Sequence, residues 1–142
     1  MEKLLNQLLA DLMAINVNLH NLHWNVSGMG FEEYHELTEG LYNDVFSKFD
    51  DVAEYLKSND MYPSASLDQY AKETKCKPLA VKDFTDEEVV ASLNDIYTYL
   101  IKSFQEIANK ADKEGHKGLV FIMTNWIGEY KKAHWMIKAR LK

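Results

Sequence analysis

Two histidines flank a glycine-containing turn near the start of the chain. In "NLHWNVSGMGFEEYH", residues 21–35, His23 and His35 stand equally far from a turn that contains Gly28 and Gly30. Apolar residues recur at spacings of three and four on both sides, so we predict two helices joined as an antiparallel hairpin. Residues equally far from such a turn lie at the same height, and neutral imidazole is a common ligand for iron, copper and zinc. We therefore predict that the two imidazoles face one point.

A pair of acids supplies the oxygen ligands that a hard ion such as iron(II) prefers. Asp50 and Glu54 lie four residues apart on the second predicted helix and share one of its faces. His35 and Asp50 are 15 residues apart, which in a helix is an advance of about 22 Å with a rotation of about 60°. One chain therefore cannot bring both to one ion. Two second helices packed antiparallel about a two-fold axis can do so, twice per dimer.

Each of these residues also has a simpler structural interpretation. A single histidine on a helix is usually a structural or surface residue, and two acids one turn apart can be a solvated helical face. Glu39, one turn after His35, can serve as a solubilising acid. The di-iron bundle signature, Glu-x-x-His on two separate helices, occurs once only, at Glu32 and His35. Spacing alone therefore favours the structural interpretation and disfavours a di-iron centre inside one bundle.

Four long helices and a short one are predicted from the apolar spacing and the helix breakers. Pro63 is expected to stop the second helix, and Thr85 with Glu88 forms a capping box ahead of the third long one. The predicted helices are, approximately, Glu2–Val26, Phe31–Asn59, Ser66–Thr74, a helix that starts after Thr85, and Leu119–Leu141. The connection from 60 to 85 is long enough for a crossover, so we predict an all-α, ferritin-like four-helix bundle whose short helix lies in that connection.

Composition narrows the class of protein. The chain has 142 residues, of which 46% are hydrophobic, and this fits one globular domain spanning 1–142. Its net charge of −6 suits cations and does not favour nucleic acid or an anionic membrane as a partner. The single cysteine, Cys76, cannot form a disulfide within the chain, which favours a cytoplasmic location. No apolar segment reads as a signal peptide or a membrane span.

The segment from His20 to Leu56 resembles the Dps family of miniature ferritins. The matching elements are His23–Trp24, Val26, Gly28, Phe31, His35–Glu36 and Asp50–Glu54. The resemblance implies a subunit that assembles through two-fold dimers into a hollow dodecamer. It also implies a ferroxidase centre shared between subunits, with His23 and His35 from one and Asp50 and Glu54 from the other. By the same resemblance Glu39 helps to hold a second, weaker iron, and Trp24 is an electron donor or simply a packing residue.

The implied activity is oxidation of iron(II) to iron(III), with hydrogen peroxide as the expected oxidant and oxygen as the alternative. Ferric oxide would collect inside the shell and protect the cell against oxidative stress. Two rival functions stay open, namely a non-catalytic or DNA-compacting shell and a protein that binds zinc or copper at the same site. Because histidine binds metal only when neutral, uptake should weaken as the pH falls below about 6.5.

The chain departs from the family pattern at several places. DNA-binding members use a mobile, lysine-rich terminus, whereas here Lys3 is the only lysine near the start, so DNA binding is expected to be weak or absent. "DKEGHKGLV", residues 112–120, mixes basic residues with the acids expected around an iron-entry pore, and the entry route stays open. Tyr55 stands where the family has an arginine, so a salt bridge beside the centre is not expected.

Overall fold

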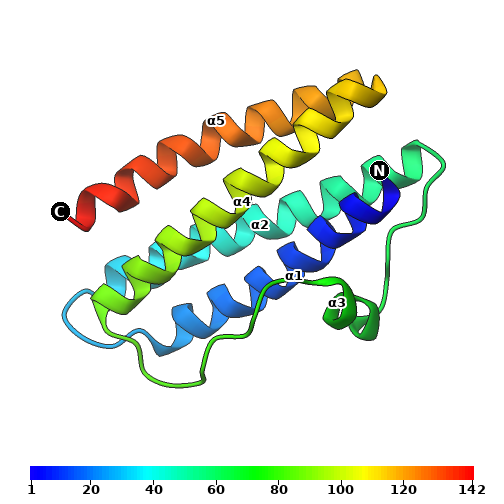
Figure 1. Ribbon diagram of the computed structural model, residues 1–142. Helices are drawn as coiled ribbons and strands as arrows, with labels where there is room; N and C mark the ends of the chain where they lie inside the picture. The colour runs from blue at the N-terminus through cyan, green and yellow to red at the C-terminus, as the bar shows by residue number, and fades with distance from the viewer. The chain divides into compact units, whose positions relative to one another are not determined.

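The computed structural model describes all residues 1–142 and contains five α-helices and no strands (Figure 1). They are α1 (Glu2–Asn25), α2 (Phe31–Ser58), α3 (Leu67–Glu73), α4 (Asp86–Glu114) and α5 (Lys117–Arg140). The predicted all-α class and the order of long and short helices are confirmed, and the boundaries differ from the predicted ones by one or two residues. None of the helices has the length and hydropathy needed to cross a membrane.

The chain divides into two compact units, Glu2–Asp86 and Glu87–Lys142, the second of which also includes Met1. The second unit is the α4–α5 hairpin, whose buried side chains are mostly aliphatic but include a cluster of four aromatic rings. The ring of Phe104 lies 5.4 Å from that of Trp126 and 5.6 Å from that of Tyr130. Tyr97 meets Tyr130 edge to face at 5.2 Å. These edge and tilted contacts are the arrangements that aromatic quadrupoles favour, and they tie α4 to α5.

The first unit is the α1–α2 hairpin with the connection that carries α3. Along α1 a stripe of buried apolar side chains recurs every three or four residues, as the sequence predicts: Leu5, Leu8, Leu12, Ile15, Leu19 and Leu22. The turn after α1 requires glycine at Gly28, whose φ of 125° is rarely adopted by other residues. Beside the turn, Val26 pairs with Phe84 in an isolated bridge, so the far end of the connection is joined to the hairpin.

Buried polar side chains of α1 hold the connection in place, and in Figure 1 the connection runs alongside that helix. The amide of Asn6 donates to the Tyr62 carbonyl at 3.0 Å. A carboxylate oxygen of Asp11 accepts from the Thr74 hydroxyl at 2.7 Å and from the backbone N–H of Lys75 at 2.8 Å. Backbone N–H and C=O groups of a loop need hydrogen-bond partners when they are buried against a helix. These polar side chains of α1 supply partners that a strand or a helix would otherwise provide.

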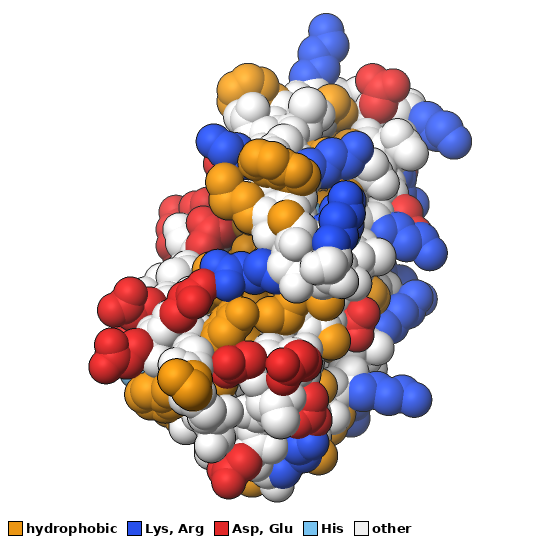
Figure 2. All heavy atoms as spheres, turned by 90° about the vertical axis from the view of Figure 1, so that its left-hand side faces the viewer, with side chains coloured by type: hydrophobic (Ala, Val, Ile, Leu, Met, Phe, Trp, Pro, Cys, Tyr) orange, Lys and Arg blue, Asp and Glu red, His pale blue; other side chains and the backbone are white.

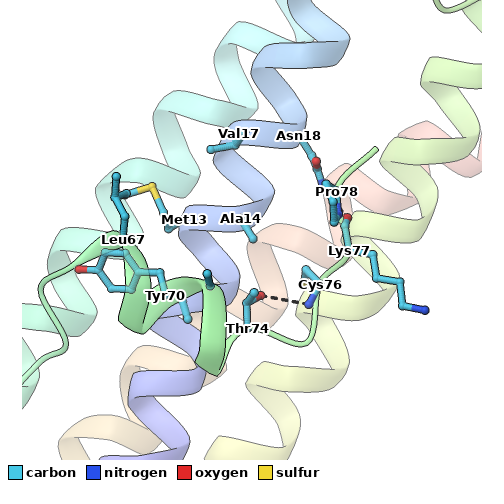
Figure 3. Close-up of a pocket in the computed structure, with 12 residues that line it drawn as sticks. Met13, Ala14, Val17, Asn18, Leu67, Tyr70, Thr74, Cys76, Lys77 and Pro78 are labelled. Carbon is cyan, nitrogen blue, oxygen red and sulfur yellow. Dashed lines mark hydrogen bonds between the residues drawn. The ribbon is translucent and has the colours of Figure 1, made fainter. Parts of the chain in front are cut away.

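A recess of about 370 Å³ opens between α1 and the connection (Figure 3). Its lining side chains include Met13 and Val17 from α1 and Tyr70 from α3. Cys76 also lines it and donates its backbone N–H to the Thr74 hydroxyl at 3.0 Å, so the backbone of this loop turns back on itself. The recess is mostly apolar.

The helix α2 ends close to the predicted residue but for a different reason. The helix stops at Ser58, ahead of Pro63, in a Schellman motif. The N–H of Met61 donates to the Leu56 carbonyl at 2.9 Å, and Asp60 takes the left-handed conformation with φ of 61°. Proline is therefore not the terminator. The hydrogen bonds that satisfy the last carbonyls end the helix before Pro63 can interrupt it.

The surface carries charges of both signs with hydrophobic side chains between them, as the face drawn in Figure 2 shows. Several large apolar side chains are exposed, namely Val17, Trp24, Met29, Phe46, Leu67, Phe121 and Trp135. Apolar side chains that are exposed singly are common on folded proteins, so this set does not by itself mark an interface.

We predict that Gly30→Ala destabilises the hairpin. A Cβ at Gly30 would lie 2.6 Å from Oδ2 of Asp86 and 2.8 Å from the Tyr34 ring, so the variant should lose about 1–3 kcal/mol of unfolding free energy, as overpacking does. Gly40→Ala is the matched control, since a Cβ there meets nothing within 4 Å and should stabilise α2 by about 0.5–1 kcal/mol. Urea unfolding of both variants tests this, and equal midpoints would contradict it.

Candidate metal centre

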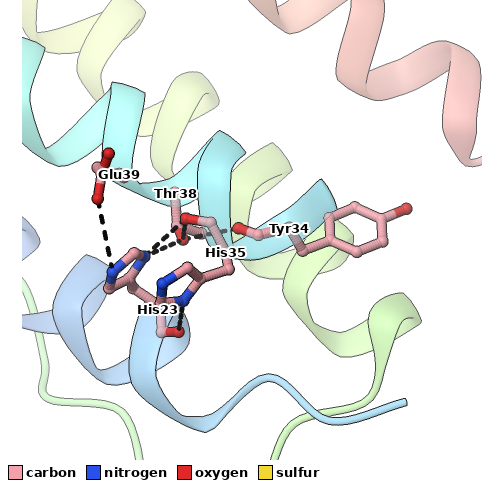
Figure 4. Close-up of polar contacts among 5 residues, drawn as sticks. All are labelled: His23, Tyr34, His35, Thr38 and Glu39. Atoms are coloured by element: carbon pink, nitrogen blue, oxygen red, sulfur yellow. Dashed lines mark hydrogen bonds and ion pairs between the residues drawn. The ribbon is translucent and has the colours of Figure 1, made fainter. Parts of the chain in front are cut away.

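The two histidines of the turn lie against each other (Figure 4). His23 is in the last turn of α1, His35 is near the start of α2, and their rings stack at a centroid distance of 3.6 Å with an angle of 15° between planes. His23 is buried, with 5% of its surface exposed, and His35 is half-buried. The prediction that the hairpin places both imidazoles at one height is confirmed.

Reciprocal hydrogen bonds to backbone carbonyls hold the two rings. Nδ1–H of His23 donates to the carbonyl of His35 at 2.6 Å, and Nδ1–H of His35 donates to the carbonyl of His23 at 2.8 Å. A carbonyl oxygen only accepts, so the proton of each neutral ring is on Nδ1. The lone pair of each Nε2 is therefore left available, which is the tautomer that a metal ligand needs.

Thr38 supports this arrangement, and the sequence analysis did not identify it. Its hydroxyl is buried, lies 3.2 Å from Nδ1 of His23, and donates to the carbonyl of Tyr34 at 2.7 Å. The hydroxyl thus gives the His23 N–H a second acceptor. A threonine that bonds back to a carbonyl four residues earlier is common in helices, so its position one turn after Tyr34 was the only signal in the sequence.

Glu39 lies next to the free nitrogen of His23. Its Oε1 is 4.0 Å from Nε2 of His23, and its side chain is 54% exposed. The predicted acid therefore stands beside the imidazole lone pair at the edge of solvent. Within one chain, however, no three His, Cys, Asp or Glu side chains converge so as to hold a metal ion.

Burial lowers the pKa of His23 below its usual value. The positive charges that protonation would place on His35 and His20 lower this pKa further, whereas the hydrogen bond to the His35 carbonyl and the Glu39 charge raise it. Burial is the largest of these effects, because a charged imidazole loses hydration there. His23 is therefore neutral at pH 7 and ready to donate its lone pair.

The carboxylate pair occupies another part of α2. Asp50 and Glu54 are both exposed, and the hydrogen bond that they share raises the pKa of Glu54, with the charge of Asp50 adding to the effect. Because α2 is one continuous helix from Phe31 to Ser58, the 15 residues between His35 and Asp50 correspond to about 22 Å. The chain brings the two histidines together, with Glu39 4.0 Å from one of them, and it brings Asp50 and Glu54 together. It does not bring the histidines and this carboxylate pair to one place.

Three more aromatic rings lie near the histidine pair, and the sequence analysis had not assigned His20 and Tyr42 to this site. Tyr42 stacks on His20 at 3.9 Å and meets His23 edge to face at 5.1 Å. Trp24 lies 5.4 Å from His20 and is 67% exposed. His20 is one turn before His23, so helical spacing alone could have placed it beside the centre.

The model of the ferritin-like domain family matches residues 2–142. This is nearly the whole chain, and five helices without strands are the elements of that fold. The chain therefore belongs to the ferritin-like family, and the predicted fold class is confirmed.

Individual relatives narrow the assignment. The chain is 32% identical over 139 residues to a Helicobacter pylori protein named DNA protection during starvation protein, covering 98% of this chain and 96% of that one. The crystal structure of Helicobacter cinaedi CAIP matches with a TM-score of 0.97 and 34% identity over 99% of both chains. That of a Vibrio cholerae Dps protein, described as a member of the ferritin-like diiron-carboxylate superfamily, matches with 0.94 and 29%, covering 99% of this chain and 88% of that one. Within the ferritin-like family, the chain is a member of the Dps family.

We predict that His23 titrates below its ordinary pKa in the metal-free protein. Its folded pKa is lowered, so the unfolded chain binds more protons between the folded pKa and about 6.5. The stability contributed by neutral His23 is thus present above about 6.5 and is lost as the pH falls through the folded pKa. NMR of the imidazole resonances and urea unfolding at several pH values measure both effects. His23→Gln should flatten this part of the stability profile, and a His23 pKa above 6.5 would contradict the argument.

Proposed function

We propose that this chain is the subunit of a ferroxidase that oxidises and stores iron. The observation that carries the proposal is the pair of stacked imidazoles whose Nδ1 protons are both taken by carbonyls. Such a pair is prepared to donate two Nε2 lone pairs, and Glu39 is the carboxylate of its own chain that lies near it, 4.0 Å from His23. It is half of a metal site, and membership of the ferritin-like family supports iron as the metal.

The other half comes from a second subunit. Asp50 and Glu54 share a hydrogen bond that raises the Glu54 pKa, so two carboxyl groups stand where a cation would relieve their repulsion. They are too far along α2 to reach the histidines of their own chain. An antiparallel two-fold contact between α2 helices would place them opposite the partner's histidines and complete two sites per dimer.

The histidine geometry favours two ions per site. A metal ion lies in the plane of the imidazole that binds it, and the two ring planes here are stacked and only 15° from parallel. One ion cannot lie in both planes without strain, so each Nε2 would serve its own ion. Glu39 would add an oxygen ligand to one of them. Mixed nitrogen and oxygen donors also accept zinc and copper, which makes these ions the rival occupants.

The reaction is then a balanced two-electron step. Each of two iron(II) ions gives one electron, the O–O bond of one hydrogen peroxide breaks, and two protons complete two water molecules. Because both electrons are supplied together, no hydroxyl radical is released. Carboxylates stabilise the iron(III) product, since hard oxygen ligands favour the higher charge. Molecular oxygen is the alternative oxidant. When only one ion is bound, we propose that Trp24, whose ring lies 5.4 Å from that of His20, or Tyr42, whose ring lies 5.1 Å from that of His23, supplies an electron.

Storage follows from the assembly that we propose, a hollow dodecamer built from two-fold dimers. Ferric oxide would collect inside it and keep iron away from peroxide in the cytoplasm. The Helicobacter pylori relative is named for DNA protection during starvation, and we propose that this chain protects by consuming iron and peroxide. With a net charge of −6, its own binding to DNA is proposed to be weak.

We predict that an Asp50→Ala, Glu54→Ala double variant keeps its assembly but oxidises iron(II) no faster than buffer does. The carboxylates are exposed and support no core, so only the ligand set is lost. Anaerobic addition of iron(II) and peroxide, followed by absorbance, measures the rate. Asp51→Asn is the control, because it removes an acid from the same helix outside the pair and should leave the rate unchanged. A double variant as fast as wild type would sink the proposal.

We also predict complementation between variants of the two halves. A His23→Ala, His35→Ala chain and an Asp50→Ala, Glu54→Ala chain should each be inactive alone. When the two are refolded together in equal amounts, half of the dimers are mixed and each mixed dimer regains one site, so activity should return to about one quarter of wild type. No recovery, in assemblies shown by mass spectrometry to be mixed, would exclude a shared site.

A further inference from the structure

A recess in the α4–α5 unit is lined by cationic side chains. It holds about 490 Å³ and is lined from α4 by Thr98, Ile101, Lys102 and Gln105 and from α5 by Lys131, His134 and Lys138. Three of these side chains are ammonium groups and none is an acid. The whole chain has 22 acids against 16 lysines and arginines, so three lysines without an acid among them are a local exception.

The floor and one wall of the recess are fixed. Ile101 is buried beneath it, and the stems of the lysines can lie along such an apolar floor. His134 is held from two sides, since its Nε2–H donates to Oδ1 of Asn94 at 2.7 Å and its ring stacks on Tyr97 at 6.0 Å. Burial lowers the pKa of His134, and the nearby Lys138 ammonium lowers it further, so that ammonium lies close to the imidazole.

The three lysines reach the recess from two helices. Lys131 and Lys138 are two turns apart on one face of α5, and Lys102 comes from α4. Gln105 adds an amide N–H2 to the lining. The Thr98 hydroxyl already donates its one proton to the Asn94 carbonyl at 2.8 Å, so the three ammonium groups and this amide are the hydrogen-bond donors that the lining offers to a ligand. A lysine ammonium binds phosphate as a point charge, and several around one anion share its oxygens. From this lining we infer that the recess is a binding site for a phosphate-class oxyanion, either orthophosphate or a short polyphosphate.

A free anion fits better than the backbone of a nucleic acid. The lysines are gathered in one recess, whereas a duplex needs phosphate contacts spread along its length. The net charge of −6 on each chain would also repel a long polyanion. The inference does not rest on the proposed iron chemistry, because none of the lining residues belongs to the candidate metal centre.

The test is isothermal titration of the assembled, iron-free protein at low ionic strength with orthophosphate and with tripolyphosphate. We expect saturable binding of at least one of them at one site per chain. Lys131→Gln, and the double variant Lys102→Gln, Lys138→Gln, should weaken it, the double variant by about tenfold. Lys132→Gln is the matched control, because it removes the same charge from the adjacent residue, which does not line the recess. It should change the affinity less than twofold.

Circular dichroism and size exclusion check that all variants fold and assemble, as expected for exposed lysines. No saturable binding of either anion to the wild-type protein would overturn the inference. Equal weakening by Lys132→Gln and Lys131→Gln would also overturn it, since it would mean attraction by net charge alone. A third arm uses a short duplex DNA at equal phosphate concentration, and tighter, recess-dependent binding of the duplex would reassign the site to nucleic acid. Loss of phosphate binding with normal iron oxidation, or the reverse, separates this inference from the proposed function.

Discussion

The exchange of hydrogen bonds between two imidazoles and two backbone carbonyls is the interaction on which the candidate centre depends. Each histidine donates Nδ1–H to the carbonyl of the other. This is possible only if the last turn of α1 and the first turns of α2 lie at one height. The glycine turn sets that height, and the close approach of Asp86 to Gly30 leaves no room there for a side chain. The same bonds that join the helices also fix the tautomer, so the local fold and the ligand chemistry have one cause.

The continuity of α2 keeps the histidines and the carboxylate pair of one chain apart. A continuous helix holds its residues at fixed separations, so the carboxylate pair cannot bend back to the histidines. The histidines and the carboxylates also have different surroundings. Burial lowers the pKa of His23 and favours its neutral form, whereas the exposed Asp50 raises the pKa of its neighbour Glu54 through a hydrogen bond and its charge. The shared site that we propose would form only where two subunits meet, so the proposed iron chemistry would depend on assembly.

The two compact units of the chain carry contrasting surface chemistry. The hairpin of α1 and α2 presents imidazoles and carboxylates, which suit a cation. The α4–α5 hairpin presents a recess with three lysines and no acid, which suits an anion. The proposed iron substrate and the inferred oxyanion have opposite charges, and each is matched by the hairpin that would bind it. The net charge of the chain, which is an average over both, describes neither surface.

Sequence periodicity alone was enough to determine the helices, their order and the pairing of His23 with His35, because these depend on local spacing and one turn. The separation of His35 from Asp50 within one chain could also be predicted, since helix geometry fixes it, and the shared site stays a proposal. Only the tertiary structure revealed Thr38 as a second acceptor for His23, the Asp11 carboxylate that holds the connection, and the convergence of Lys102 with two lysines of α5. Each of these three contacts depends on residues far apart in the chain or on the rotamer of one side chain. Helical spacing of three or four residues predicts neither long-range proximity nor a rotamer.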